Sequence, residues 1–434
     1  KQNLCAVGDD DQSIYAFRGA SVQNILNFKQ DFPEAEVVTL KQNYRSTKKI
    51  IEAANNIIIN NVTRAKKSMV TDNPEGEEIS LNQAYDEKEE AEFVSQEICH
   101  LLQNGHKASE IAVFYRTNAQ SRAVEEIFCE YGLPYEIYGG HKFYDRKEIK
   151  DILSYLKLLI NSQDNEAFLR VINTPTRGIG KTSLEGLAKY ASATGLALLP
   201  ALAKATSVKA SWVSKANHSK FAKFLNMISQ LRESARTANM LLSGQSLGAS
   251  LGERKGAIAH LLKEVAEKSE YLSRLQAEET TEAQSRLENI EELYRVAYEF
   301  TERALTQEDK LSLNDFLDRA SLSSQSDMGE KSDRQASSKI EGSISLMTLH
   351  LAKGLEFDSV FLVGMEEGLL PHSRSIYQKE ALEEERRLCY VGVTRAKRKL
   401  FLSYASSRRS YGSQSPQYGE PSRFLDEIGF RNLF

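Results

Sequence analysis

Two arginines, Arg45 and Arg395, stand in sequence settings that suit the chemistry of phosphoryl transfer. Arg45 belongs to Gln-Asn-Tyr-Arg-Ser at 42–46, and Arg395 belongs to Val-Gly-Val-Thr-Arg-Ala-Lys at 391–397, about 350 residues later. Two guanidinium groups around one γ-phosphate would stabilise the charge that builds up during its transfer, and the ring of Tyr44 could stack on adenine. A lone Tyr-Arg pair is more often a surface ring beside a salt-bridged arginine, so Arg45 needs support from elsewhere in the chain.

The usual partner of such arginines, a phosphate-binding loop of the form Gly-x-x-x-x-Gly-Lys-Ser/Thr, does not occur in the sequence. Residues 178–182 end in Gly-Lys-Thr, but the first glycine of the loop would stand where the chain has Pro175. Proline removes a backbone N–H and fixes φ where a phosphate cradle needs donors and conformational freedom. The preceding residues, 167–173, also lack the buried strand that should lead into such a loop. We therefore do not interpret 178–182 as a nucleotide loop.

An acidic run near the start of the chain is a second candidate for chemistry. The apolar residues 4–7 lead into Asp9, Asp10 and Asp11, followed by Gln12. Polar groups at the end of a parallel strand lie where α/β folds bind ligands, and carboxylates there could hold Mg²⁺. An Asp-rich turn that caps the next helix would have the same sequence, and the spacing leaves both interpretations open.

Aromatic and cationic residues next to two of these segments suit contacts with nucleic acid. Tyr15, Phe17 and Arg18 place rings beside a guanidinium, a combination that stacks bases and binds phosphate. Residues 348–356 bring a hydroxyl, an imidazole, an ammonium and a carboxylate to the end of a predicted strand. A single histidine is usually structural, but the clustering weakens that interpretation. The charges at 383–387 form i,i+3 and i,i+4 pairs, which predict a mainly solvated helix face.

Composition narrows the class of protein. The 434 residues give room for roughly two or three domains, and the 41% hydrophobic content is enough for ordinary cores. With a formal net charge of −4, any contact with nucleic acid must use a local groove. The four cysteines are widely spaced, which argues against a zinc site or disulfide framework and fits a reducing compartment. No apolar run of about 18 residues or signal peptide is present, so we expect a cytoplasmic protein without a membrane partner.

Two α/β stretches must position these residues, and a helical stretch separates them. Residues 85–160 and those after 343 alternate helix and strand patterns, which predicts a parallel sheet, whereas long helical periods fill most of the sequence between them. The predicted helices cover 87–104, 121–131, 256–277, 283–305 and 379–397, and the predicted strands cover 4–7, 111–115, 135–138, 344–348, 360–363 and 400–404. A helical domain inserted into an α/β domain is the expected architecture.

Taken together, these segments resemble the UvrD/PcrA/Rep group of superfamily 1 DNA helicases. Residues 7–20 resemble the third helicase motif of that group, 43–46 the fourth, 348–357 with 360–361 the fifth, and 390–397 the sixth. The four motifs occur in the family's order, and the resemblance covers essentially the whole chain. It implies an ATP-dependent 3′–5′ helicase or translocase that acts in DNA repair or replication. The alternative is a non-catalytic module that binds DNA or a partner protein.

The resemblance also implies roles for individual residues around the nucleotide. Gln12 would sense the γ-phosphate and couple it to DNA, and Tyr44 would stack on adenine. Arg45 and Arg395 would act as arginine fingers, and Glu356 would meet the ribose. ATP and Mg²⁺ are the implied cofactors of the intact enzyme, although no metal ligand is assigned within this chain.

The implied nucleic-acid partners are single-stranded DNA and single/double-strand junctions, and the family also suggests repair proteins or RNA polymerase as partners. Gly178 and Gly180 would offer backbone N–H groups to duplex phosphates. The family often has Trp where Phe17 stands, so stacking should persist with a smaller ring. The residues expected to contact DNA are Tyr15, Phe17, Arg18, Arg116, Phe143, Arg146, Arg177, Gly178, Gly180, Lys181, Thr348, His350 and Lys353.

The resemblance further implies a domain plan with RecA-like sheets. Residues 1–40 would be the end of a first motor domain, 41–160 and 344–434 the two parts of a second, 161–322 an inserted helical domain, and 323–343 a flexible linker. In the family, the phosphate-binding loop and the Asp-Glu pair that holds Mg²⁺ precede the third motif. We therefore expect a carboxyl-terminal fragment that cannot hydrolyse ATP alone. A helicase subunit of a nuclease complex would need an added nuclease domain, for which we find no sequence sign.

Overall fold

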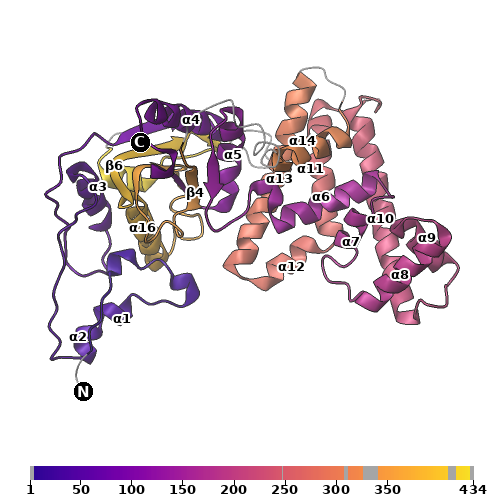
Figure 1. Cartoon of the computed structure of the whole chain (residues 1–434), viewed down its shortest axis with the longest axis horizontal. Coiled ribbons are helices and arrows are strands. Elements are labelled where there is room, and N and C mark those ends of the chain that lie inside the picture. Colours follow the sequence, from indigo (N-terminus) through magenta and orange to yellow (C-terminus); the bar gives the residue numbers. More distant parts are fainter. Residues whose placement is uncertain (1–3, 247, 307–310, 326–340, 409–416, 431–434) are drawn as a thin grey trace. The chain divides into compact units, whose positions relative to one another are not determined.

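The computed structural model describes residues 4–246, 248–306, 311–325, 341–408 and 417–430. The chain divides into two compact units, one made of Lys1–His141 with Ala336–Phe434 and the other of Lys142–Gln335. Within the described residues, the first unit holds the sheets and the second contains helices only (Figure 1). We call them the sheet unit and the helical unit.

The sheet unit is built on six parallel strands in the order β1-β6-β5-β2-β4-β3. The strands are β1 Ser80–Ala84, β2 Ile111–Tyr115, β3 Tyr135–Ile137, β4 Ile344–Thr348, β5 Phe357–Leu362 and β6 Ala396–Ala405. Every residue of β2 and β5 is buried, because the central strands of a parallel sheet are covered on both faces. This explains the unbroken apolar sequence of β2, whereas β5 also buries Asp358 and Ser359. The predicted α/β fold with a parallel sheet is confirmed.

Helices cover both faces of this sheet. Along β2, Ala112 and Phe114 pack into one apolar cluster, while Ile111, Val113 and Tyr115 pack into the other, as the alternation of a strand requires. The first cluster includes helices α3 Lys48–Ile58, α16 Lys379–Val393 and α17 Arg423–Ile428, and the second includes α4 Glu87–Gln103 and α5 Ser121–Glu130. A short antiparallel pair, β7 Ser407–Arg408 and β8 Gln417–Tyr418, lies outside the main sheet.

The N-terminal segment of the sheet unit departs from the sequence prediction. Residues 4–7 form no strand, and Leu4 and Val7 are exposed by 69% and 88%. A strand needs a neighbour to satisfy its backbone groups, and no described residue pairs with this stretch. The segment instead contains the short helices η1 Asp10–Gln12, η2 Ala16–Arg18, α1 Gln23–Leu26 and α2 Phe28–Asp31.

The helical unit begins earlier than the expected boundary at residue 161. Helix α6 Lys147–Ile160 belongs to it, because this helix packs on α7, α10, α11 and α13. The helices of this unit are α6, α7 Asn165–Val171, α8 Lys181–Thr194, α9 Leu198–Ser207, α10 Lys215–Leu242, α11 Leu251–Lys268, α12 Tyr271–Glu278, α13 Thr281–Thr306 and α14 Leu313–Gln325, preceded by η5 Phe143–Asp145. Helix α14 extends into the expected linker 323–343, of which 326–340 lies outside the described residues.

One close approach in the helical unit requires a glycine. A Cβ at Gly186 of α8 would lie 2.7 Å from an atom of the Trp212 ring, so only glycine lets this ring pack on the helix.

Among the described residues, no helix is both long and apolar enough to cross a membrane.

Candidate active site and nucleic-acid interface

Arg45 and Arg395 meet at the beginning of strands β5 and β6. Glu356 is the residue before β5, and Arg395 is the residue before β6. Arg45 donates from Nε to Glu356 Oε2 at 2.7 Å and from Nη1 to the Thr394 carbonyl at 3.1 Å. Lys397 Nζ lies 2.8 Å from the other carboxylate oxygen of Glu356. We call Arg45, Glu356, Arg395 and Lys397 the arginine cluster.

A turn before α3 fixes Arg45 in this cluster. The side-chain oxygen of Asn43 accepts from the backbone N–H groups of Arg45 and Ser46, both at 2.9 Å. Ser46 Oγ then donates to the carbonyl of Ala396, the first residue of β6, at 2.6 Å. The same turn leaves Tyr44 82% exposed. Its ring is therefore accessible to a planar ligand.

Arg395 is a buried cation held mainly by neutral groups. Its side chain donates to the carbonyls of Val391 and Leu355 at 3.0 and 3.2 Å, and to Thr394 Oγ1 at 3.0 Å. The residue is only 3% exposed, and within the described part of the chain it forms no ion pair with a carboxylate. Burial lowers the pKa of Arg395 to about 10, and the nearby charge of Arg45 adds to this effect. An anion beside both guanidinium groups would relieve their repulsion.

Glu356 is ionised over the whole neutral range. Hydrogen bonds from Lys397 and Arg45 hold the pKa of its carboxyl at about 2. About two-fifths of its side chain is exposed, as is that of Lys397, so solvent reaches this side of the cluster. The carboxylate can thus accept hydrogen bonds from a ligand while it holds both cations.

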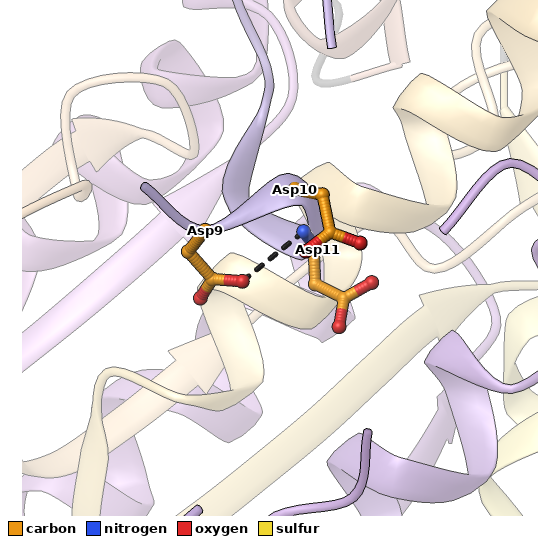
Figure 2. Close-up of side chains that lie close together, drawn as sticks. All are labelled: Asp9, Asp10 and Asp11. Carbon is orange, nitrogen blue, oxygen red and sulfur yellow. Dashed lines mark hydrogen bonds between the residues drawn. The ribbon is translucent and has the colours of Figure 1, made fainter. Parts of the chain in front are cut away.

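The acidic run does not fit a magnesium site, because cations of the chain already occupy it. Figure 2 shows Asp9, Asp10 and Asp11 side by side, with an Asp9 carboxylate oxygen accepting from the Asp11 N–H at 3.2 Å. Arg64 binds both oxygens of Asp11 at 2.8 Å, and Lys67 Nζ lies 2.6 Å from Asp9 Oδ1 and also contacts Asp10. We call these five residues the clasp. Of the two interpretations left open by the sequence, the structure supports the turn.

Gln12 and Tyr15 connect the clasp to the turn after β4. Gln12 Nε2 donates to Asp9 Oδ2 at 2.6 Å, and Lys353 Nζ donates to the Gln12 carbonyl at 2.9 Å. Tyr15 donates its hydroxyl hydrogen to the His350 carbonyl at 3.1 Å. The Tyr15 ring also makes cation–π contacts with Lys353 and Arg18, whose charged groups lie 5.2 and 5.8 Å from the ring centroid.

Thus an exposed cationic strip with a tyrosine at its centre follows the end of β4. Lys353 and Arg18 are exposed, and Thr348, which ends β4, is half-buried. We call Tyr15, Arg18, His350 and Lys353 the cationic strip. Aromatic rings and cations of this kind track the backbone and bases of single-stranded nucleic acid. The side chain of Phe17 lies outside the described residues.

Comparison with known proteins gives a consistent result. Residues 38–407 match the family model of the UvrD-like helicase C-terminal domain, and residues 1–33 match that of the UvrD/REP helicase N-terminal domain. The chain belongs to the UvrD-like helicase family. It is 45% identical over 430 residues to the ATP-dependent DNA helicase PcrA of Bacillus subtilis and 42% identical over 429 residues to that of Staphylococcus aureus strain Mu50, with 98% of this chain and 54% of each relative covered. The chain therefore spans about half the length of the curated relatives it matches.

Within this UvrD-like fold, several residues expected to contact DNA are instead engaged inside the protein. Arg116 forms a two-pronged ion pair with Glu385, whose side chain is 6% exposed. In the helical unit, Phe143 is 1% exposed, and Arg146 is 6% exposed and donates to Asn289 Oδ1 at 2.7 Å. Phe143 and Arg146 are thus buried, Arg116 is half-buried in an ion pair, and the contact of these three residues with DNA stays a proposal.

The loop at 174–181 contains a half-buried arginine and an exposed tip. The Arg177 guanidinium donates to the carbonyls of Val171 and Thr174 at 2.8 and 3.1 Å and to the Tyr155 hydroxyl at 2.6 Å. Arg177 thus closes the end of α7 with bonds inside the protein, and its contact with DNA stays a proposal. Gly178, Gly180 and Lys181 are exposed, and Lys181 begins α8 with 91% of its side chain accessible. Their expected contact with DNA remains possible in geometry and is a proposal.

All of the charged stretch 383–387 of α16 except the half-buried Glu384 is buried, contrary to the prediction of a solvated face. Glu383, Glu385, Arg386 and Arg387 are each at most 7% exposed. The predicted i,i+4 pair between Glu383 and Arg387 is present at 3.5 Å. The other partners come from other elements: besides Arg116, Glu427 lies 2.7 Å from Arg386, and the Val62 N–H donates to Glu383 at 3.0 Å. Spacing within one helix cannot reveal such pairs. The same applies to Arg64, Lys67 and Lys397, which the sequence analysis did not single out.

The imidazole of His350 in the cationic strip should stay neutral at pH values well below the ordinary pKa of histidine. Burial lowers its pKa to about 4, the charges of Arg116 and Arg18 favour the neutral form further, and Glu385 opposes them. The unfolded imidazole has a pKa of about 6.5, so lowering the pH from about 6.5 to 4 adds a proton to the unfolded chain first and destabilises the sheet unit.

An NMR titration of the histidine ring protons tests this prediction. We expect one of the seven histidine signals to keep its neutral shift down to about pH 5, and to be missing in His350→Gln. If the signal lost in that variant instead titrates near pH 6.5, the proposed environment of His350 is wrong.

Proposed function

We propose that this chain supplies the second motor half of an ATP-dependent 3′–5′ DNA helicase or translocase of the UvrD/PcrA type, acting in DNA repair or replication. The observation that carries the proposal is Arg395, a buried cation without a carboxylate partner in the described residues, held beside Arg45 at the start of β5 and β6. Such a pair is suited to the γ-phosphate of a nucleotide bound by an opposing domain.

In this proposal the arginine cluster completes a nucleotide site whose phosphate-binding loop is not in this sequence. Arg45 and Arg395 act as the arginine fingers, Tyr44 stacks on adenine, and Glu356 accepts from a ribose hydroxyl. ATP with Mg²⁺ would supply the phosphoryl group and the charge neutralisation that its transfer needs. The clasp supports the view that the acidic run does not hold the metal, since Lys67 and Arg64 already pair with its three carboxylates.

The cationic strip is the proposed contact with single-stranded DNA. Gln12 connects the clasp to the strip, because its side-chain amide donates to Asp9 and its backbone carbonyl accepts from Lys353 of the strip. Phosphate oxygens would lie against Lys353 and Arg18, and a base edge would approach His350 as a neutral hydrogen-bonding group. Thr348 and Phe17 are proposed to contact the same strand. The exposed Gly178, Gly180 and Lys181 would meet duplex backbone at a single/double-strand junction.

The family resemblance suggests repair proteins or RNA polymerase as partners and the cytoplasm as the location. We include both in the proposal. Binding of DNA does not require them. The first test therefore uses DNA and nucleotide only.

We predict that the purified chain binds single-stranded DNA but does not turn over ATP. Fluorescence anisotropy with a labelled oligo(dT) should report binding that weakens as salt is raised, because lysine and arginine contacts release counterions from the phosphates. Phosphate release with ATP, Mg²⁺ and the same oligonucleotide should stay at the background rate, since the chain offers no phosphate-binding loop. ATP turnover by this chain that Arg395→Ala abolishes would overturn the proposal that another domain must supply the phosphate-binding loop. Failure to bind the oligonucleotide at low salt would overturn the proposed DNA interface.

A further inference from the structure

Asp9 joins the clasp to Gln12. Its Oδ1 accepts from Lys67 Nζ at 2.6 Å, and its Oδ2 accepts from Gln12 Nε2 at 2.6 Å. A carboxylate held on both oxygens cannot rotate without breaking one contact. The orientation of the Gln12 amide is therefore set by a carboxylate whose own position depends on Lys67.

On its other side, Gln12 is connected to the cationic strip. Lys353 Nζ donates to the Gln12 carbonyl at 2.9 Å while lying 5.2 Å from the centroid of the Tyr15 ring. A continuous path of contacts thus runs from Lys67 through Asp9 and Gln12 to Lys353 and Tyr15. Each contact between successive residues is a hydrogen bond, an ion pair or a cation–π contact. It begins in the segment after α3 and ends in the strip.

The clasp provides a firm starting point for this path. Asp10 and Asp11 are 5% and 1% exposed, and the side chain of Arg64 is 10% exposed. Burial by itself would lower the pKa of Lys67, but its bonds to Asp10 and Asp9 outweigh burial and raise it. The pKa of Asp10 is lowered: burial alone would raise it, but the bonds from Lys67 and from the Ala65 N–H, together with the charge of Lys67, outweigh burial. Asp10 and Lys67 therefore stay charged at neutral pH, and the ion pair between them is kept.

We infer that Lys67 is a positioning residue for the DNA interface: through Asp9 it fixes Gln12, and through Gln12 the placement of Lys353 and Tyr15. This inference rests on the proposed function, because it assumes that the strip contacts single-stranded DNA. Lys67 itself lies outside the strip and is joined to it through Asp9 and Gln12. The alternative is that Lys67 only braces the fold.

The test compares Lys67→Met with Lys66→Met in the 434-residue chain by anisotropy with a labelled oligo(dT). Both variants lose one positive charge, but Lys66 is an exposed neighbour outside the clasp. We expect Lys67→Met to bind the oligonucleotide about fivefold more weakly than Lys66→Met, which corresponds to one poorly placed base or ring. Lys67→Arg keeps the cation and should restore most of the affinity.

Two further variants separate positioning from bracing. Asp9→Ala breaks the path while leaving Asp10 and Asp11 paired with Arg64 and Lys67, so it should reproduce the loss of affinity, and it decides the question if Lys67→Met does not fold. In a Gln12→Ala background, Lys67→Met should have little additional effect on affinity. The inference is overturned if Lys67→Met and Asp9→Ala bind as well as Lys66→Met and lower only the melting temperature. If the unaltered chain fails to bind, the proposed function itself is wrong.

Discussion

Replacing Arg395 with alanine, in a helicase that joins this chain to a phosphate-loop domain, should lower kcat for ATP hydrolysis about 10³- to 10⁵-fold. The buried guanidinium forms no carboxylate ion pair in the described part of the chain, so an approaching γ-phosphate finds a cation that is not already neutralised. Arg45→Ala should have an effect of the same order. Its pair with Glu356 is partly exposed, with 28% and 44% of the two side chains accessible, and breaking it should cost little stability.

Arg398→Ala is the matched control for both substitutions. Arg398 lies three residues beyond Arg395, its side chain is 63% exposed, and it pairs with Asp358 away from the arginine cluster. We expect near-normal hydrolysis in this control and near-normal affinity for oligo(dT) in all three variants. Near-normal kcat in both Arg45→Ala and Arg395→Ala would remove the basis for assigning these residues to the γ-phosphate.

Replacing Arg408 with methionine should lower the free energy of unfolding of the sheet unit by about 3–5 kcal/mol, because it leaves two buried carboxylates without their cation. Arg408 lies 2.7 Å from both Glu90 of α4 and Glu366 of the loop after β5. Their side chains are 5% and 3% exposed. Burial alone would lower the pKa of Arg408, but the two carboxylates outweigh it and raise the pKa.

Hydrogen exchange followed by mass spectrometry can assign this loss to one unit of the molecule. Peptides from β5 and β6 should exchange much faster in Arg408→Met, whereas peptides from α11 and α13 of the helical unit should be unchanged. Arg398→Met removes a guanidinium that is 63% exposed, and its single carboxylate partner, Asp358, keeps the contact with His106, so this variant should shift exchange far less. Equal protection in Arg408→Met and Arg398→Met would show that the two carboxylates do not depend on Arg408.

Strand β2 was predictable because burial on both faces leaves a plain apolar sequence. The predicted strands at 111–115 and 344–348 coincide with β2 and β4. Strand β1 was missed, since its sequence Ser-Leu-Asn-Gln-Ala is polar and only Ala84 is buried at the edge of the sheet. Strand β6 begins at Ala396, inside the predicted helix 379–397, because α16 ends at Val393. Arg395 therefore lies in the short connection and not on the helix.

The candidate site was predictable only where a motif marks it. Arg45, Glu356 and Arg395 came from family motifs, and the structure brings Arg45 into contact with Glu356 across 311 residues of sequence. The partners of the acidic run, Arg64 and Lys67, lie in a stretch without periodicity or recognised spacing. Charge pairs between distant elements depend on the folded arrangement, which explains why Arg116 and Arg177 were expected at DNA but are bound to groups of the protein itself.

The most direct test of the account is the ATP hydrolysis of a chimera in which this chain replaces the corresponding half of the PcrA helicase from Bacillus subtilis, to which it is 45% identical. The chimera should hydrolyse ATP, and single-stranded DNA should stimulate the rate, because the arginine cluster and the cationic strip would both be supplied by this chain. A folded chimera that binds ATP and oligo(dT) yet shows no DNA-stimulated hydrolysis would contradict the proposal that this chain is the second half of a DNA motor.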